Sequence, residues 1–428
     1  MHCFSSSNIL HIRGDRLNIE VPSHAYDQRA ASRHAVFGAR VLGPIFAEFA
    51  LRLWIFLSSI EDPDGASVLF CARGGLRLRL IFEHFLKSTG LESPVIFGDL
   101  MVSRLIAARA AVLAESPAVG EEIEREFYGE SMLTVAQALA QETHELEECW
   151  QTPFDALAFN RLLRADLPGS RRLLQSIEEQ NALFLSHLQR RAGGRGRIIL
   201  CDTGLYGSTM RWLERALPHI KWSCVLFARN NYKGFPTDHF ARTRGLSVEQ
   251  NVYVPTNPRT AVLRYWQLIE SILEPEIPSV KSFQMVSGCD EPRSNLEIEG
   301  WEDRLYPSKG ELFAGVLDYM DQIKGEALFK IYEDAARAWH SLKRTVIWPE
   351  PGEIAWLGAG ERSRDFGRSD SIPPLSAVGP RGLRAILRHS VWREGEIAQS
   401  FPAARPLLLA CIEGAYIGRW AYRLLRRG

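Results

Sequence analysis

The residues best suited to chemistry lie together in one short stretch, DTGLYGST, at positions 202–209. Glycines let backbone N–H groups approach a ligand, and nearby hydroxyl groups add further donors. An acid in the same stretch adds a group that can accept hydrogen bonds or a proton. This combination is suited to binding phosphate or another anion. The candidate ligand-binding residues are Thr203, Gly204, Tyr206, Gly207, Ser208 and Thr209, with Asp202 as the candidate catalytic residue.

The flanking residues predict a strand before this stretch and a helix after it. Residues 198–201 form an apolar run of the length that a buried strand needs, and apolar residues in 210–217 recur at helical spacing. In open α/β sheets, a loop between such elements places the positive end of a helix at the carboxyl ends of the strands. The sequence leaves a second interpretation open: an ordinary turn in which Ser208 or Thr209 serves only as an N-cap.

A second glycine turn follows an earlier strand candidate, residues 67–71. Arg73, Gly74 and Gly75 come directly after that strand. Arginine can bind a phosphate with two parallel hydrogen bonds, which makes Arg73 a candidate ligand for the same anion. Arg104, at the start of a later predicted helix, is a further candidate.

Two other motif matches point to chemistry that the sequence does not support. Residues 200–204 have the form of an aspartic protease signature, but that chemistry needs two carboxylates that share a proton, and only one DTG is present. Asp62 and Asp64 match the opening of a phosphoryl-transfer site. In that chemistry the aspartates follow a strand, whereas here they precede one, so we expect a turn.

The central loop resembles that of the type I phosphoribosyltransferases. Tyr206, Gly207 and Thr209 follow Asp202 by four, five and seven positions. In that family, acids bind the ribose hydroxyls, turn amides and hydroxyls hold the 5-phosphate, and an earlier glycine turn binds pyrophosphate; residues 67–75 have the shape of that turn. Here Cys201 replaces the first acid of the family pattern, and Tyr206 replaces a small hydroxyl residue.

A broader resemblance covers residues 30–330. Several segments are similar to the C-terminal region of predicted HAD-superfamily hydrolases encoded with bacterial surface-polysaccharide genes. Those relatives usually begin with a phosphatase-like module that is not recognisable here, and Gly74 stands where their turn tends to have an aspartate. The resemblance therefore implies a pathway and not the HAD reaction. The segments are residues 34–54, 67–78, 103–112, 198–210 and 268–280.

Bulk composition narrows the class of protein. The 428 residues carry 51 basic and 51 acidic side chains, so net charge gives no reason to expect a nucleic-acid partner. The 7 cysteines are scattered without metal-ligand spacing, which is typical of a reduced, cytoplasmic protein. We recognise no signal peptide, and no apolar run reaches the length of a membrane span, so we expect a soluble protein.

The chain divides into segments of different character. The C-terminal segment has 9 arginines against 3 glutamates, which suggests either a peripheral membrane or protein contact or a solvated terminal helix. We expect an irregular lead-in over 1–27, an α/β core over 28–300 with a helical insertion over 101–191, a helical segment over 301–347, a linker-like segment over 348–380 and a basic helical C-terminus over 381–428.

The sequence predicts an α/β protein with a mostly parallel sheet and a phosphoribosyltransferase-like or Rossmann-like core. The predicted function is a cytoplasmic, HAD-hydrolase-associated protein of surface-polysaccharide biosynthesis that binds a phosphorylated sugar or nucleotide. Asp202 would contact sugar hydroxyls or a metal, with Mg²⁺ as the candidate cofactor. Two alternatives stay open: a phosphoribosyltransferase-like transferase, and a non-catalytic assembly or regulatory module with a degenerate site. The basic C-terminus would place the protein at the periphery of the inner membrane.

Overall fold

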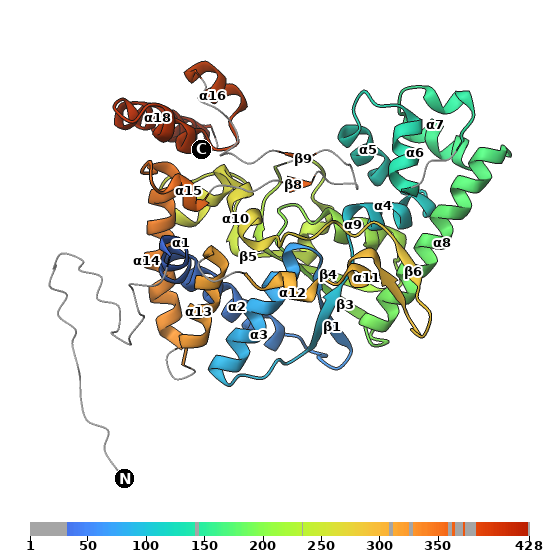
Figure 1. Cartoon of the computed structure of the whole chain (residues 1–428), viewed down its shortest axis with the longest axis horizontal. Coiled ribbons are helices and arrows are strands. Elements are labelled where there is room, and N and C mark those ends of the chain that lie inside the picture. The colour runs from blue at the N-terminus through green and yellow to red at the C-terminus, as the bar shows by residue number, and fades with distance from the viewer. Residues whose placement is uncertain are drawn as a thin grey trace, which may run out of the picture.

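The structure is a computed structural model of the 428-residue chain. It describes residues 32–141, 145–232, 234–307, 311–324, 328–357, 362–363, 371–372 and 382–426. A central sheet carries helices on both faces, and a helical lobe extends to one side of it (Figure 1). The predicted lead-in over 1–27 and most of the linker-like segment over 348–380 lie outside the described residues.

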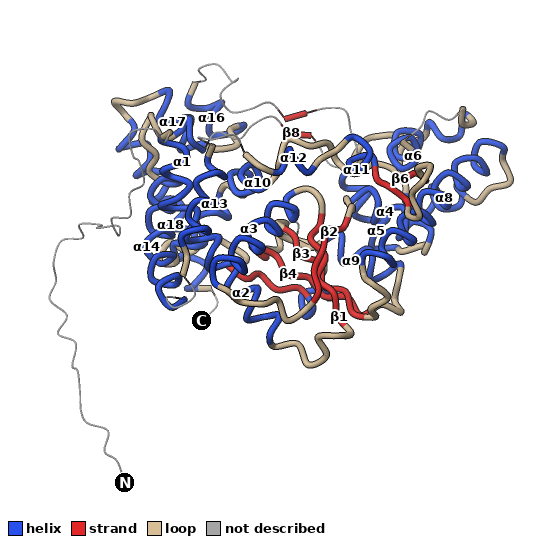
Figure 2. The backbone as a smooth tube through the Cα atoms, turned by 60° about the horizontal axis from the view of Figure 1, so that its bottom comes forward, coloured by secondary structure: helices blue, strands red, loops and turns tan. Residues whose placement is uncertain are grey.

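One parallel sheet of five strands forms the centre of the molecule, in the order β2-β1-β3-β4-β5 (Figure 2). β1 lies between β2 and β3 and pairs with both in parallel. The chain therefore runs from β1 outward to one side, then returns to place β3 on the other side of β1. The strands are β1 (Ala66–Cys71), β2 (Ile96–Leu100), β3 (Arg197–Asp202), β4 (Lys221–Arg229) and β5 (Thr243–Glu249).

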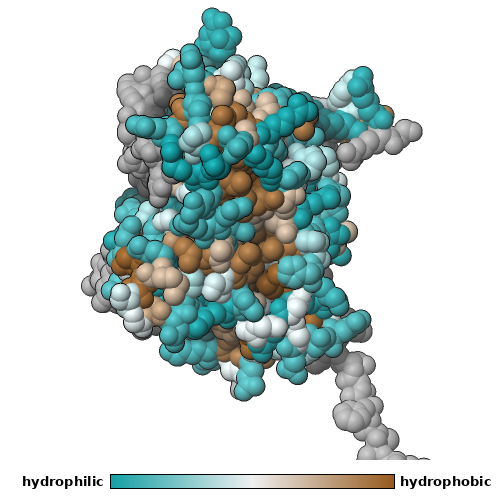
Figure 3. Space-filling view, turned by 90° about the vertical axis from the view of Figure 1, so that its right-hand side faces the viewer, coloured by the Kyte–Doolittle hydropathy of each residue, from teal (hydrophilic) through white to brown (hydrophobic). Residues whose placement is uncertain are grey.

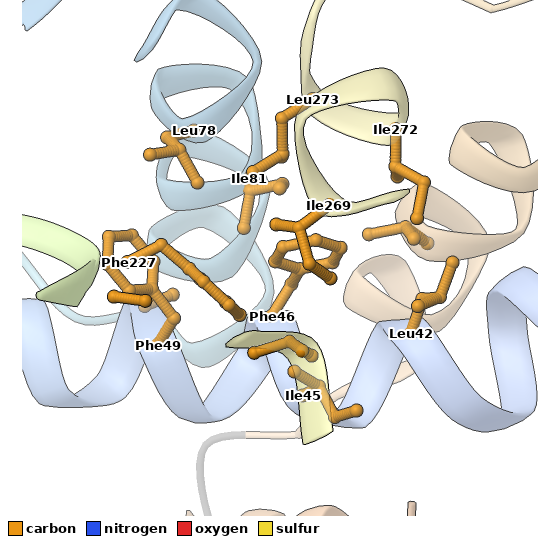
Figure 4. Packing of buried hydrophobic residues seen from close by; sticks show 14 of the residues in the cluster. Leu42, Ile45, Phe46, Phe49, Leu78, Ile81, Phe227, Ile269, Ile272 and Leu273 are labelled. Atoms are coloured by element: carbon orange, nitrogen blue, oxygen red, sulfur yellow. The ribbon is translucent and has the colours of Figure 1, made fainter. Parts of the chain in front are cut away.

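Both faces of the inner strands are buried, which explains why they read as continuous apolar runs. Val68, Phe70 and Ile199 belong to a cluster on one face with residues of α2, α3, α10, α13 and α14. Leu69 and Leu200 belong to a second cluster on the other face, with residues of α4, α8 and α9. Figure 4 shows how side chains of helices and strand interlock in the first cluster. The helices of the first cluster are α2 (Gly43–Ser58), α3 (Gly74–Thr89), α10 (Trp266–Leu273), α13 (Leu312–Gln322) and α14 (Leu328–Ile347).

The first helical stretch comprises α1 (Arg33–Phe37), a π-helical turn (Gly38–Leu42) and α2. Gly43 and Pro44 do not end this helical stretch. Pro44 lies in the first turn of α2, where a missing N–H removes no helical hydrogen bond, and the π-turn precedes it. By length and composition Arg33–Ser58 could cross a membrane, and 72% of its most apolar window is buried inside the protein.

The predicted helical insertion is confirmed between β2 and β3. Helices α5 to α8 form the lobe at the right of Figure 1. On the face that this lobe presents, apolar side chains reach the surface between polar ones (Figure 3), and Leu157 is among the exposed large apolar residues. The insertion comprises α4 (Arg104–Leu113), α5 (Pro117–Glu126), α6 (Met132–Ala140), a 3-10 turn (Glu148–Gln151), α7 (Ala156–Leu163) and α8 (Pro168–Arg191).

Three local features depend on tertiary context. β5 is a strand although its stretch is polar, because an edge strand exposes side chains such as Arg244. Residues 296–298 are helical, since Ser294 and Glu297 form a capping box that starts α11 (Asn295–Glu299). Residues 258–273 form a 3-10 turn (Pro258–Arg264) followed by α10.

The C-terminal half adds further helices, 3-10 turns and the strand pairs β6-β7 and β8-β9 to this core. α13 and α14 share the first apolar cluster, so residues of the predicted 301–347 segment are part of the main core. The predicted helical C-terminus is confirmed. The remaining elements are α9 (Ser208–Ala216), a 3-10 turn (Asp238–Arg242), β6 (Phe283–Met285), β7 (Pro292–Ser294), α12 (Glu302–Leu305), α15 (Ile354–Leu357), β8 (Arg362–Ser363), β9 (Ser371–Ile372), α16 (Leu383–His389), α17 (Arg393–Ser400) and α18 (Arg405–Leu425).

Candidate functional site

The two predicted loops leave the sheet side by side. β1 and β3 are adjacent and parallel, with Phe70 opposite Cys201 in the register. The glycine turn after β1 and the 202–209 loop after β3 therefore lie at the same edge of the sheet. After these loops, α3 covers one face of the sheet and α9 covers the other. In open α/β sheets the crevice at such a switch in strand order is where ligands bind.

Two glycines allow these loops to touch. A Cβ atom at Gly74 would lie 2.6 Å from Cγ2 of Thr203, and one at Gly75 would lie 2.8 Å from the carbonyl oxygen of Cys201. Both distances are shorter than real Cβ contacts, so any larger residue would push the loops apart. A larger side chain at position 74 would displace the side chain of Thr203.

Asp202 ends β3 and is held by the residue that follows it. The backbone N–H of Thr203 donates to Oδ1 of Asp202 at 2.7 Å, and the Thr203 hydroxyl lies 3.5 Å from the same oxygen. Burial raises the pKa of the Asp202 carboxyl to about 7; the Thr203 hydrogen bond lowers it in part, and the nearby carboxylates of Glu274 and Glu270 raise it further. At neutral pH this carboxyl therefore exchanges a proton readily, which suits a general acid or base.

The candidate arginines are already paired with carboxylates. The guanidinium of Arg73 lies 3.1 Å from Oε2 of Glu274, and it also donates to the carbonyl of Ile277 at 3.4 Å. These contacts join the β1 loop to the segment that follows α10. Arg104 begins α4, and its guanidinium lies 3.8 Å from Oε2 of Glu126. Both arginines thus already have an acidic partner.

The start of α9 receives a carboxylate from the helical insertion. Gly207 is the N-cap, with a φ of 77° in the left-handed region, so neither Ser208 nor Thr209 is the cap. The buried Ser208 hydroxyl donates to Oε2 of Glu122 at 3.3 Å, and Glu122 also forms an ion pair with the buried Arg211. Because a helix N-terminus favours negative charge, α9 and Arg211 together stabilise this acid.

Tyr206 packs the loop against the segment 235–240. Its hydroxyl donates to the carbonyl of Pro236 at 2.5 Å, and its own carbonyl oxygen lies 2.6 Å from Nε2 of His239. The ring is buried against Phe235 and Phe240. Burial raises the pKa of its hydroxyl to about 12. The side chain of Tyr206 thus lies within the protein and is not available to a ligand at the surface.

The three cysteines of the central strands are packed as small apolar side chains. Cys71, Cys201 and Cys224 are at most 2% exposed. Burial raises the pKa of each thiol well above its usual value, which keeps the thiols protonated and unreactive.

Sequence reasoning missed the acids of this site. Glu122 comes from α5, and Glu270 and Glu274 lie in and just after α10, each far from residue 202 along the chain. Each sits in an ordinary helical pattern, so nothing local indicates that it faces the loop. Among the described residues, no group of three or more His, Cys, Asp or Glu side chains is arranged to hold a metal ion.

Chemically, this edge of the sheet offers the N-terminus of α9 after β3, a carboxyl whose pKa is raised to about 7 and arginines paired with acids. Such a set can bind a polar, anionic ligand and exchange a proton with it. We found no protein-family model that matches the chain and no curated protein with significant similarity to it.

Proposed function

We propose that this chain binds a phosphorylated sugar or nucleotide at the edge of the sheet where the β1 loop and the β3 loop meet. The observation that carries the proposal is the contact of Gly74 and Gly75 with the start of the β3 loop, at the switch in strand order. The backbone N–H groups of Gly204 and of residues 207–209 would hold phosphate, as glycine-containing turns before helices do. Asp202 would contact sugar hydroxyls.

Mg²⁺ fits this proposal as a cofactor bound together with the ligand. Mg²⁺ typically takes one or two carboxylates from the protein and completes its shell with phosphate oxygens and water. Asp202 would supply that carboxylate, and its proton would leave when the ion binds. Arg73, which Glu274 holds at the β1 loop, would contact a second phosphate group.

The proposed biological setting rests on sequence resemblance. The segments similar to HAD-associated proteins of surface-polysaccharide genes include the β1 loop, the start of α4 and the β3 loop, which are the parts that meet at this edge of the sheet. We therefore place the protein in cytoplasmic surface-polysaccharide biosynthesis, with a phosphorylated sugar or nucleotide as the ligand. An alternative proposal is that the same site catalyses a phosphoribosyltransferase reaction.

A non-catalytic assembly or regulatory module is the second candidate, and one observation favours it. Ser208 and Arg73, two of the groups expected to hold phosphate, already bind the carboxylates of Glu122 and Glu274. A ligand would have to share or displace these acids. A site of this kind can bind a ligand without stabilising a transition state, since only interactions that strengthen in the transition state speed a reaction.

A thermal-shift screen tests the proposal. The ligands are phosphosugars, nucleotides and phosphoribosyl pyrophosphate, each with and without Mg²⁺. A ligand at about 100 times its Kd stabilises a protein by about 2.7 kcal/mol, which gives a clear rise in Tm. We expect such a rise in the wild type and none in Asp202→Ala. The exposed carboxylate Asp303 provides the matched control, and Asp303→Ala should respond like the wild type.

The same screen separates the candidates. Pyrophosphate release from phosphoribosyl pyrophosphate would support the transferase, whereas a Tm rise without turnover would support the binding module. A folded wild-type protein whose Tm responds to none of these ligands would contradict the proposed site. A rise that persists in Asp202→Ala would place the ligand elsewhere.

A further inference from the structure

The C-terminal helix α18 is fixed to the protein along one side only. Leu409 and Glu413 are its buried residues. Oε1 of Glu413 accepts from the Tyr253 hydroxyl at 2.6 Å, and its carboxylate pairs with Arg264, which is itself buried. A buried acid held by an arginine and a tyrosine fixes the rotation of the helix, so the side chains that face outward are well defined.

The outward side of α18 is apolar. Leu407 and Leu425 are 69% and 82% exposed, and Leu424 is 52% exposed. Ile417 and Cys411 are exposed as well. Leu407, Cys411 and Leu425 share one face of the helix, and Ile417 and Leu424, seven positions apart, lie on the adjacent face, so the set forms a broad apolar stripe. Figure 1 shows α18 at the outside of the molecule, across from the α5–α8 lobe.

Positive charge borders this stripe without any acid. Arg419, Arg423 and Arg426 are exposed, and the helix's single acidic residue, Glu413, faces inward. The guanidinium of Arg419 lies over the Tyr416 ring at 5.4 Å, and that of Arg426 lies over the Tyr422 ring at 4.9 Å. Arginines that rest on aromatic rings beside an apolar stripe are typical of helices that lie in a membrane interface.

We propose that α18 docks the protein on an anionic lipid bilayer, with its apolar stripe in the headgroup region and its arginines on lipid phosphates. Charge complementarity favours a bilayer over a second copy of the chain. Two copies that met along this stripe would bring their arginines together, while Glu413, the acid of α18, faces inward in each copy. The proposal is independent of the phosphate site between β1 and β3.

Vesicle sedimentation tests the proposal with the full-length protein. One set of vesicles is pure phosphatidylcholine, and the other contains equal parts of phosphatidylcholine and phosphatidylglycerol. An arginine near an anionic surface contributes about fivefold to partitioning, so the triple variant Arg419→Gln/Arg423→Gln/Arg426→Gln should lose about a hundredfold. The matched control is Arg33→Gln/Arg161→Gln/Arg171→Gln, three exposed arginines far from α18 in sequence. A second test variant, Leu424→Ser/Leu425→Ser, removes apolar contact and keeps the charge.

We expect the wild type and the control to sediment with the anionic vesicles only, and both α18 variants to stay in solution with an unchanged Tm. Sedimentation should weaken as salt is raised, because salt screens the attraction. The proposal would be overturned by a folded wild type that does not bind anionic vesicles, or by α18 variants that bind as well as the wild type. A dimer that Leu424→Ser/Leu425→Ser dissociates, without vesicle binding, would show instead that a second copy covers the stripe.

Discussion

At the scale of single residues, Gly75 determines whether the two loops of the candidate site can meet. A Cβ atom there would approach backbone atoms, the carbonyl oxygen of Cys201 at 2.8 Å and the carbonyl carbon of Phe70 at 3.2 Å. Backbone atoms of buried strands cannot rotate away. Gly75→Ala should therefore lower the free energy of unfolding by about 1–3 kcal/mol and weaken ligand binding.

Gly196→Ala is the matched control for this substitution, since a Cβ atom at Gly196 would have no neighbour within 4 Å. It should leave the stability unchanged or slightly raised. Thermal melts of both variants give the comparison. Equal Tm values for the two alanine variants would show that the loops do not pack as tightly as the structure indicates.

Asp202 makes stability depend on pH. Free aspartate has a pKa of about 3.9, whereas burial raises that of Asp202 to about 7. The folded state therefore binds the proton more tightly, and this group's contribution to stability falls as pH rises from about 4 to about 7. Asp202→Asn keeps an acceptor for the Thr203 N–H and removes the ionisation. We compare the Tm of the variant minus the Tm of the wild type at two pH values. This difference should be larger at about pH 8 than at about pH 5, because only the wild type loses stability when the carboxyl ionises. An equal difference at both pH values would contradict the raised pKa.

The sequence predicted the residues of the β3 loop but not the roles of all of them. Spacing and residue type identified Asp202 and the glycines, because turn chemistry is local. Tyr206 was predicted to bind the ligand, but its side chain is buried against the segment 235–240. Glu122 was missed because the contact between α5 and α9 joins residues far apart in sequence.

At the scale of elements, the stretch Arg33–Ser58 that ends with α2 is long and apolar enough to cross a membrane, yet α2 is a core helix that carries one buried acid. Glu48 is fully buried within an otherwise apolar helix. Arg259 binds both of its carboxylate oxygens, at 2.6 and 2.7 Å, and the Trp339 indole N–H donates at 3.0 Å. Burial alone would raise the pKa of Glu48, but these hydrogen bonds and charges lower it below its usual value.

Removing this charge should weaken the packing of α2 against α14. Glu48→Gln leaves Arg259 and Arg52 without their ionic partner; because both guanidiniums reach solvent, the cost should be about 1–3 kcal/mol. Glu83→Gln is the control, because the Arg79–Glu83 pair is partly exposed and such pairs contribute about 1 kcal/mol or less. Chemical denaturation measures both changes. A Glu48→Gln protein as stable as Glu83→Gln would show that the ion pair does not hold α2 in place.

Elements were predictable where the pattern was strong. The inner strands and the helical insertion carry continuous apolar runs or clear helical periods, and both were confirmed. β5 was missed because an edge strand buries only part of its side chains. The strand order was not predictable either, because it depends on which strands pair across long insertions; β1 and β3 are separated by the whole helical lobe.

At the scale of the whole molecule, the strand order brings together two loops that lie more than a hundred residues apart. The β1 loop leads into α3 at Gly74 and the β3 loop follows Asp202, yet both leave the same edge of the sheet. The insertion between them also contacts this edge, since Glu122 of α5 accepts a hydrogen bond from Ser208 at the start of α9. A ligand bound where the loops meet would therefore contact residues from both halves of the core.

Hydrogen–deuterium exchange tests this account most directly, because it reports backbone N–H groups. The protein is compared alone, with phosphoribosyl pyrophosphate and Mg²⁺, and with a nucleoside diphosphate and Mg²⁺. The account predicts slower exchange in peptides covering 72–76 and 202–210 with at least one ligand, and no change in the exposed part of α18. Protection confined to other segments, or none with either ligand, would contradict a phosphate site between β1 and β3.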